Sequence, residues 1–262
     1  MLFRSNGYGA TANWSTATKS IPVGTPTADY KFVFVSGSWD QSGGTALGAK
    51  LFVDSIATTS TASVNLFQGT VCTTCRISAN TVSFTGDVNF ASTAARLSIA
   101  SASTITGTLS GTGGLIKDGA GALTITGTPG YSGATTITNS SLIFKNNAAP
   151  STSGFSGANA QLTIEPDAAS ASFASALALN YTYGAGLTSL TIGKTGNTSN
   201  ITTSTAVSVA GPIRIFGGNV TINGALTTTD TSTGDVLLQG ADINGTGGFN
   251  LATGRKIGRA HV

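Results

Sequence analysis

Apolar and small polar residues alternate along most of the chain in very short blocks. A period of two places the apolar side chains on one face of a strand and the polar one on the other. The recurring blocks are Val82-Ser83-Phe84, Leu97-Ser98-Ile99, Leu123-Thr124-Ile125, Leu162-Thr163-Ile164, Leu190-Thr191-Ile192, Val207-Ser208-Val209, Val220-Thr221-Ile222 and, with arginine at the centre, Ile213-Arg214-Ile215. The pattern therefore predicts many short β-strands, each with one buried face.

Clusters of Gly, Asn and Ser separate the strands, as expected of turns. Short, chemically interchangeable strands favour an all-β fold, a right-handed parallel β-helix (β-solenoid), with a less regular N-terminal β region. In such a fold the apolar residues of one turn stack on their equivalents in the next. Asn223-Gly224 and Asn244-Gly245 are also typical of β-hairpins, so an antiparallel sandwich stays open as the alternative.

One segment departs from the period of two. Residues 168–180 carry Phe173, Leu177 and Leu179 among alanines, which fits either a short helix or an irregular insertion. No run of apolar residues approaches the length of a membrane-spanning helix. We therefore expect no membrane insertion by this segment.

Residues 107–144 contain a longer pattern. They read Gly-Thr-Leu-Ser-Gly-Thr-Gly-Gly-Leu-Ile-Lys-Asp-Gly-Ala-Gly-Ala-Leu-Thr-Ile-Thr-Gly, followed by Thr-Pro-Gly-Tyr-Ser-Gly-Ala-Thr-Thr-Ile-Thr-Asn-Ser-Ser-Leu-Ile-Phe. This stretch resembles the passenger-associated repeat of bacterial autotransporters. It departs from that repeat at Asn139-Ser140, where the family commonly has a glycine. A weaker second copy begins at Ile243.

The resemblance implies an exported passenger domain at the bacterial cell surface, normally followed by a C-terminal outer-membrane barrel that this sequence lacks. On that basis we expect a structural, presentational stalk of adhesin type, without catalysis or cofactor. Its partners would be host or environmental surface glycans or proteins. We divide the chain into an N-terminal β region at 6–80 and a β-helix passenger at 81–255.

The two ends look like translated sequencing adapters and are expected to be non-native, at 1–5 and 256–262. These two ends account for the net positive charge of the chain. The chain has 13 Lys and Arg and 10 Asp and Glu, for a formal charge of +3. Without Arg4, Lys256 and Arg259 the basic count equals the acidic count. Nothing then supports nucleic-acid binding through basicity. The single histidine, His261, also lies in this end.

The repeat predicts which side chains point inward and where the chain turns. The inward set is Leu109, Leu115, Leu123, Ile125, Ile137, Leu142 and Phe144. Gly113, Gly114, Gly119 and Gly121 are expected at corners, where φ is positive or neighbouring backbones approach closely. Lys117-Asp118 is expected to form the exposed tip of a turn.

Cys72 and Cys75 form the pattern Cys-x-x-Cys. A zinc site would need a second pair or histidines, and a redox site would need a βαβ setting. We therefore favour a local disulfide in an oxidising compartment, with free thiols as the alternative.

Other candidate chemistry is sparse. Gly193-Lys194-Thr195 lacks the earlier glycine of a phosphate loop, and we expect a turn there. Glu165 and Asp167 are closely spaced carboxylates, but Pro166 between them favours a loop. The alternative function is a carbohydrate-active β-helix enzyme or carbohydrate-binding module. Several acidic groups with Arg or Lys on one outer sheet would favour that alternative.

Tyr181 and Tyr183 would point the same way on a strand. They are weak candidates for a sugar-stacking contact, and packing in the core is the competing interpretation.

Overall fold

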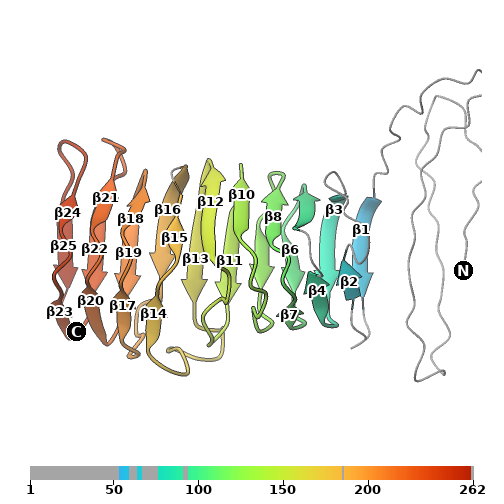
Figure 1. Cartoon of the computed structure of the whole chain (residues 1–262), viewed down its shortest axis with the longest axis horizontal. Helices are drawn as coiled ribbons and strands as arrows, with labels where there is room; N and C mark the ends of the chain where they lie inside the picture. Colours follow the sequence, from blue (N-terminus) through green and yellow to red (C-terminus); the bar gives the residue numbers. More distant parts are fainter. Residues whose placement is uncertain (1–52, 59–63, 67–75, 91–93, 185, 261–262) are drawn as a thin grey trace, which may run out of the picture. The chain divides into compact units, whose positions relative to one another are not determined.

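A computed structural model describes residues 53–58, 64–66, 76–90, 94–184 and 186–260 of the chain (Figure 1). These residues contain strands and no helix. All strand pairs between them are parallel, and they build a β-solenoid of about 9 turns. The predicted all-β parallel solenoid is thereby confirmed, and the antiparallel sandwich is excluded for this part of the chain.

Each complete turn visits three faces. Face one holds β5 (Ala95–Ile99), β8 (Leu115–Asp118), β10 (Thr135–Thr138), β12 (Gly154–Ala158) and β15 (Thr182–Tyr183), and continues with β18 (Val207–Val209), β21 (Leu226–Thr228) and β24 (Phe249–Asn250) as a separate sheet. The strands of this face run side by side along the stack in Figure 1.

Face two is the most continuous. It holds β6 (Ser103–Ile105), β9 (Leu123–Ile125), β11 (Ser141–Lys145), β13 (Ala160–Glu165), β16 (Leu187–Ile192), β19 (Ile213–Phe216), β22 (Val236–Gln239) and β25 (Ile257–Ala260). β25 pairs in register with β22, so the C-terminal segment expected to be non-native continues the ladder.

Face three is interrupted in the middle of the stack. Its strands are β2 (Val64–Leu66), β4 (Val88–Phe90), β7 (Leu109–Ser110), β14 (Leu177–Leu179), β17 (Ile201–Thr203), β20 (Asn219–Ile222) and β23 (Asp242–Asn244). Between β7 and β14 this face has no strand in the described residues, and isolated backbone contacts at Pro129 connect the turns. Leu109 bridges to Pro129, and Ser151 N donates to Pro129 O at 2.9 Å.

The strand β3 (Arg76–Phe84) turns the corner between two faces. Its first half pairs with β5 and its last residues pair with β6. β1 (Val53–Thr58) pairs with the same strand, so the ladder already includes residues before position 81.

The core consists of apolar columns that run along the solenoid axis. Leu123 pairs with Leu142, which pairs with Leu162, and the column continues through Leu190, Ile213 and Val236. Every side chain of this column is at most 1% exposed. The inward set predicted from the repeat is also buried throughout. Stacking is what stabilises each turn, because a single turn buries too little apolar area to offset its ordering entropy.

The segment 166–176 leaves the stack between β13 and β14 and contains no helix. The helical alternative for residues 168–180 is therefore wrong, and the irregular insertion is right. Phe173 and Leu177 are buried, and β14 pairs with β17. Leu177 and Leu179 therefore alternate on a strand, with both side chains buried, because β17 in the neighbouring turn supplies hydrogen-bond partners for their backbone.

Lys117 is not at an exposed turn tip. It lies within β8, and its side chain is fully buried. Its Nζ donates to Asp118 O at 2.7 Å, Gly119 O at 3.1 Å and Ser140 Oγ at 2.7 Å. Three acceptors around one ammonium group make this burial tolerable, because a buried charge needs hydrogen-bond partners.

Candidate functional site

The outer surface of face two carries a shallow groove of about 580 Å³. Hydroxyl and amide side chains make up most of its lining. The lining residues are Gln161, Thr163, Thr188, Ser189, Thr191, Gly211, Pro212, Arg214, Thr233 and Asp235. A second depression of about 310 Å³, on the side of β22 and β25, shares Pro212, Arg214 and Asp235 with it. The lining of this second depression also includes Ile213, Val236 and Leu237, so it is more apolar than the groove.

Strand alternation explains why these side chains face outward. In β13, β16 and β19 the flanking apolar residues enter the core, so the central residue of each triplet must face solvent. Thr163 pairs with Thr191, and Thr191 pairs with Arg214. Their backbones are separated by the strand spacing of roughly 4.8 Å. The floor of the groove is therefore a row of polar side chains along the solenoid axis.

A β-bulge shapes one side of the groove. Ala160 pairs with Leu187 while Gln161 pairs with Ser189, so Thr188 is an additional residue in β16. Thr188 Oγ1 donates to Ala160 O at 3.0 Å, which fixes the bulge against the preceding turn. Bulges redirect side chains, and this one brings Thr188 to the groove.

Arg214 is the cation of the groove, and it is exposed. No hydrogen bond or ion pair of its side chain is present within the part of the chain that the structure describes. Other cations are engaged: Arg96 pairs with Asp118 at 3.4 Å and Lys145 pairs with Glu165 at 3.2 Å. Arg214 therefore presents an uncompensated guanidinium beside threonine and serine hydroxyls.

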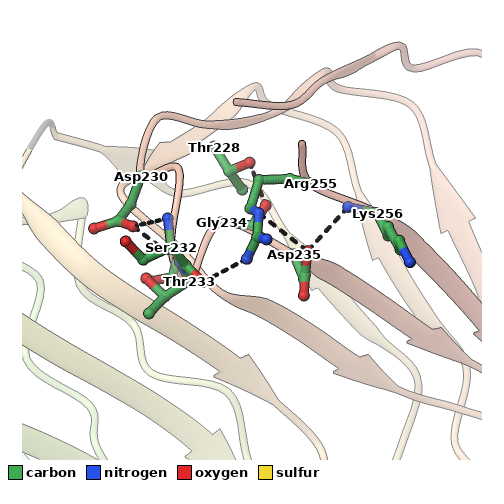
Figure 2. Close-up of polar contacts among 9 residues, drawn as sticks. Thr228, Asp230, Ser232, Thr233, Gly234, Asp235, Arg255 and Lys256 are labelled. Atoms are coloured by element: carbon green, nitrogen blue, oxygen red, sulfur yellow. Dashed lines mark hydrogen bonds and ion pairs between the residues drawn. The ribbon is translucent and has the colours of Figure 1, made fainter. Parts of the chain in front are cut away.

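The loop before β22 contributes Thr233 and Asp235 to the other side of the groove. Figure 2 shows the polar contacts of this loop. Asp230 Oδ1 accepts hydrogen bonds from Ser232 N at 2.6 Å and Thr233 N at 2.9 Å. These backbone bonds lower the pKa of Asp230, since they stabilise the carboxylate. Thr233 Oγ1 donates to Gly211 O at 3.0 Å, which holds the loop against the previous turn.

The carboxylate of Asp235 lies beside a different cation, Arg255. It pairs with Arg255 at 3.7 Å, and its Oδ1 accepts a hydrogen bond from Lys256 N at 2.9 Å (Figure 2). Arg255 Nη1 also donates to Ser232 O. Asp235 forms no ion pair with Arg214, and no carboxylate of the described residues lies within 4 Å of the Arg214 guanidinium.

The predicted corner glycines lie where the backbone requires them. Gly119 has φ +80, and a Cβ on Gly121 would lie 2.2 Å from Ser101 O. A Cβ on Gly114 would lie 2.1 Å from Ala134 O. Gly113 is buried, and its own carbonyl carbon lies 2.4 Å from where a Cβ on Gly133 would be. The close approaches at Gly114 and Gly121 and the positive φ of Gly119 agree with the roles that the repeat predicts for these three glycines.

Tyr181 and Tyr183 are buried, at 7% and 9% exposure, and their rings pack with Phe155. Tyr181 Oη donates to Pro150 O at 2.5 Å, and burial raises its pKa to about 12. The two rings therefore belong to the core rather than to a sugar-stacking surface. Cys72 and Cys75 lie outside the described residues.

The remaining candidates have structural partners. Gly193 has φ +73 and begins the turn predicted after Ile192. Asp167 Oδ2 accepts a hydrogen bond from Asn147 Nδ2 at 2.7 Å, and Asp167 O accepts one from Lys194 Nζ at 2.7 Å. Glu165 pairs with Lys145 as noted, so the two carboxylates do not form a shared site.

Sequence reasoning did not single out Arg214 as a site residue. The available signal was its position at the centre of Ile213-Arg214-Ile215, where most other triplets have serine or threonine. Asp235 and Thr233 gave no such signal, because they meet Arg214 only through the stacking of successive turns.

Within the described ranges, no group of three or more His, Cys, Asp or Glu side chains is placed to hold a metal ion. The same ranges contain no helix long and apolar enough to cross a membrane. No protein-family model matches the chain, and no curated protein or solved structure matches it either. The assignment of function therefore depends on the fold and the groove.

Proposed function

We propose that the chain is part of the stalk of an exported, autotransporter-like surface protein. Its role is mechanical and presentational: a stiff rod that holds other parts of the protein away from the cell. The observation that carries this proposal is the unbroken register of the core column from Leu123 to Val236. A parallel ladder with a dry core resists local opening, because each turn is held by its neighbours on both sides.

The resemblance of residues 107–144 to the passenger-associated repeat supports the same role. The residues that define the resemblance are the ones that the stack uses. Leu115 and Leu123 enter the core, and Gly114 and Gly121 stand where a side chain would meet the backbone of a neighbouring turn.

A carbohydrate-active enzyme is the alternative. Glycoside hydrolysis ordinarily uses two carboxyl groups that face each other across the substrate. Among the described residues that line the groove, Asp235 is the one carboxylate, and it is paired with Arg255. This distribution supports a stalk without catalysis.

Surface display tests the proposal. The full chain is placed between an N-terminal epitope and a C-terminal outer-membrane barrel and expressed in a Gram-negative cell. We expect antibody to reach the epitope on intact cells, and the chain to resist added protease. A Leu142→Asp variant, which places a charge in the core, is the matched control and should lose protease resistance.

Two results would contradict the stalk. One is an epitope that antibody reaches only after the outer membrane is permeabilised. The other is release of sugar products from polysaccharides by the purified chain, which would restore the enzyme as the leading function.

A further inference from the structure

We propose that the groove on face two binds an acidic oligosaccharide, with Arg214 as the contact for a sugar carboxylate. This site goes beyond the proposed stalk function, since a rod needs no ligand. The juxtaposition that carries the proposal is an unpartnered guanidinium within a groove of hydroxyl and amide side chains.

The charge of the groove selects an anion. Arg214 has no counter-ion among the residues that the structure describes, while Asp235 lies 3.7 Å from Arg255. A guanidinium offers a planar pair of donors that matches a carboxylate in a bidentate arrangement. The groove therefore presents one strong site for an acidic group rather than a diffuse basic patch.

The neighbours of Arg214 select a sugar. Thr191 on the adjacent strand β16 is in direct register with Arg214, and Ser189 lies two residues before it on the same strand. Thr163 on β13, one strand further along, is in register with Thr191. Their hydroxyls both donate and accept hydrogen bonds, as do the hydroxyls of a sugar. Gln161 adds an amide at the far end of the same surface. A lining of this kind makes many weak polar contacts to an extended, hydroxyl-rich ligand.

The spacing of the floor favours an oligosaccharide over an acidic peptide. The polar side chains repeat with the strand spacing of roughly 4.8 Å, close to the length of one hexose unit. In an extended peptide, side chains on the same face recur at about 6.6 Å. Their spacing would no longer match that of the polar side chains of the groove after two strands. The polar row from Thr163 on β13 to Arg214 on β19 covers two strand spacings, on the order of 10 Å, which fits a short oligosaccharide.

The groove is also held in shape before any ligand binds. The Thr188 bulge is tied to Ala160 O at 3.0 Å, and Thr233 is tied to Gly211 O at 3.0 Å. A preformed groove reduces the entropy lost on binding. The two walls come from different turns, so the site exists only when the turns are stacked.

The test is titration calorimetry of the full chain with β-1,4-linked tetramannuronate. Its neutral counterpart, β-1,4-mannotetraose, differs in having hydroxymethyl groups in place of carboxylates. We expect binding of the acidic tetramer, weakening as salt is added, and at least a roughly ten-fold lower affinity for the neutral one. Tetraglutamate is the peptide comparison and should bind no better than the neutral sugar.

Arg214→Gln should lower the affinity for tetramannuronate roughly ten-fold or more and leave thermal unfolding unchanged, because the side chain is exposed and unpartnered. The matched control is Arg96→Gln, an arginine on face one that pairs with Asp118 at 3.4 Å. That variant should bind as the wild type does. The proposal is overturned by an absence of binding, by equal binding of mannotetraose or tetraglutamate, or by unchanged affinity in Arg214→Gln.

Discussion

The ammonium group of Lys117 and the hydroxyl of Ser140 lie 2.7 Å apart in the interior of two consecutive turns. Ser140 Oγ in turn donates to Gly121 O at 2.9 Å. The lysine of the repeat therefore connects the backbone of its own corner with the next turn. In the resembling repeat Ser140 stands near the position of a glycine, and here its hydroxyl completes the contact.

Lys117→Met tests this connection, because methionine keeps the aliphatic volume and removes the donors. Asp118 O and Gly119 O would each lose a hydrogen bond. We expect the free energy of unfolding to fall by about 1–3 kcal/mol in denaturant titrations. Lys145→Met is the control. Its partly exposed ion pair with Glu165 contributes under about 1 kcal/mol, so an equal loss in both variants would contradict the buried connection.

The same lysine predicts a pH dependence. Burial lowers the pKa of Lys117 from 10.5 to about 8, with Asp118 opposing the shift. Between those two values the unfolded chain binds more protons than the folded chain, so stability should rise with pH. Above about pH 10 the buried tyrosines act the other way, because burial raises the pKa of Tyr131 and Tyr183 above that of the unfolded chain.

Denaturant titrations from pH 7 to 10 measure this effect. We expect the free energy of unfolding of the wild type to rise relative to that of Lys117→Met. Parallel profiles for the two proteins would mean that Lys117 does not titrate in this range.

Gly121→Val should destabilise the solenoid strongly. A Cβ at this position would lie 2.2 Å from Ser101 O and 2.6 Å from Ser101 N, so two adjacent turns would have to separate. Overpacking of this kind costs roughly 1–3 kcal/mol, visible as a lower Tm. Gly248→Val is the matched control, since no atom lies within 4 Å of its Cβ position. Comparable Tm values for the two variants would refute the close approach.

Tyr183→Phe should leave stability unchanged or raise it. The Oη of Tyr183 is buried without a hydrogen-bond partner, so removing it relieves an unpaired polar atom. Tyr181→Phe should cost about 1 kcal/mol, because Tyr181 Oη donates to Pro150 O. The comparison is a pair of thermal unfolding curves, and a larger loss in Tyr183→Phe would contradict the assignment.

The sequence predicts the fold well because each short segment determines its own strand and its own buried face. Triplets such as Leu123-Thr124-Ile125 specify both the strand and its buried face. The buried Leu142 and Phe144 of the next turn pair with Leu123 and Ile125 in register. The environment of Lys117 was mispredicted because a charged residue beside a glycine is typical of a turn. Its burial depends on Ser140, which lies one turn away.

The groove was the least predictable feature. Arg214, Thr188 and Thr233 come from three separate segments, and only the stacked turns bring them to one surface. The bulge at Thr188 arises from a register shift between β13 and β16, which no single strand encodes.

The insertion at 166–176 has a consequence for how such a rod can diversify. It loops out at a corner, yet Leu162 still pairs with Leu190 across it. Lys194 and Asn147 hold its first residues from the turns on either side. Between Asp167 and the buried Phe173, the largely exposed residues 168–171 can lengthen or change composition while the neighbouring turns keep their partners. A foreign peptide inserted at this loop would be displayed on the surface while the strand pairing of the solenoid stays the same.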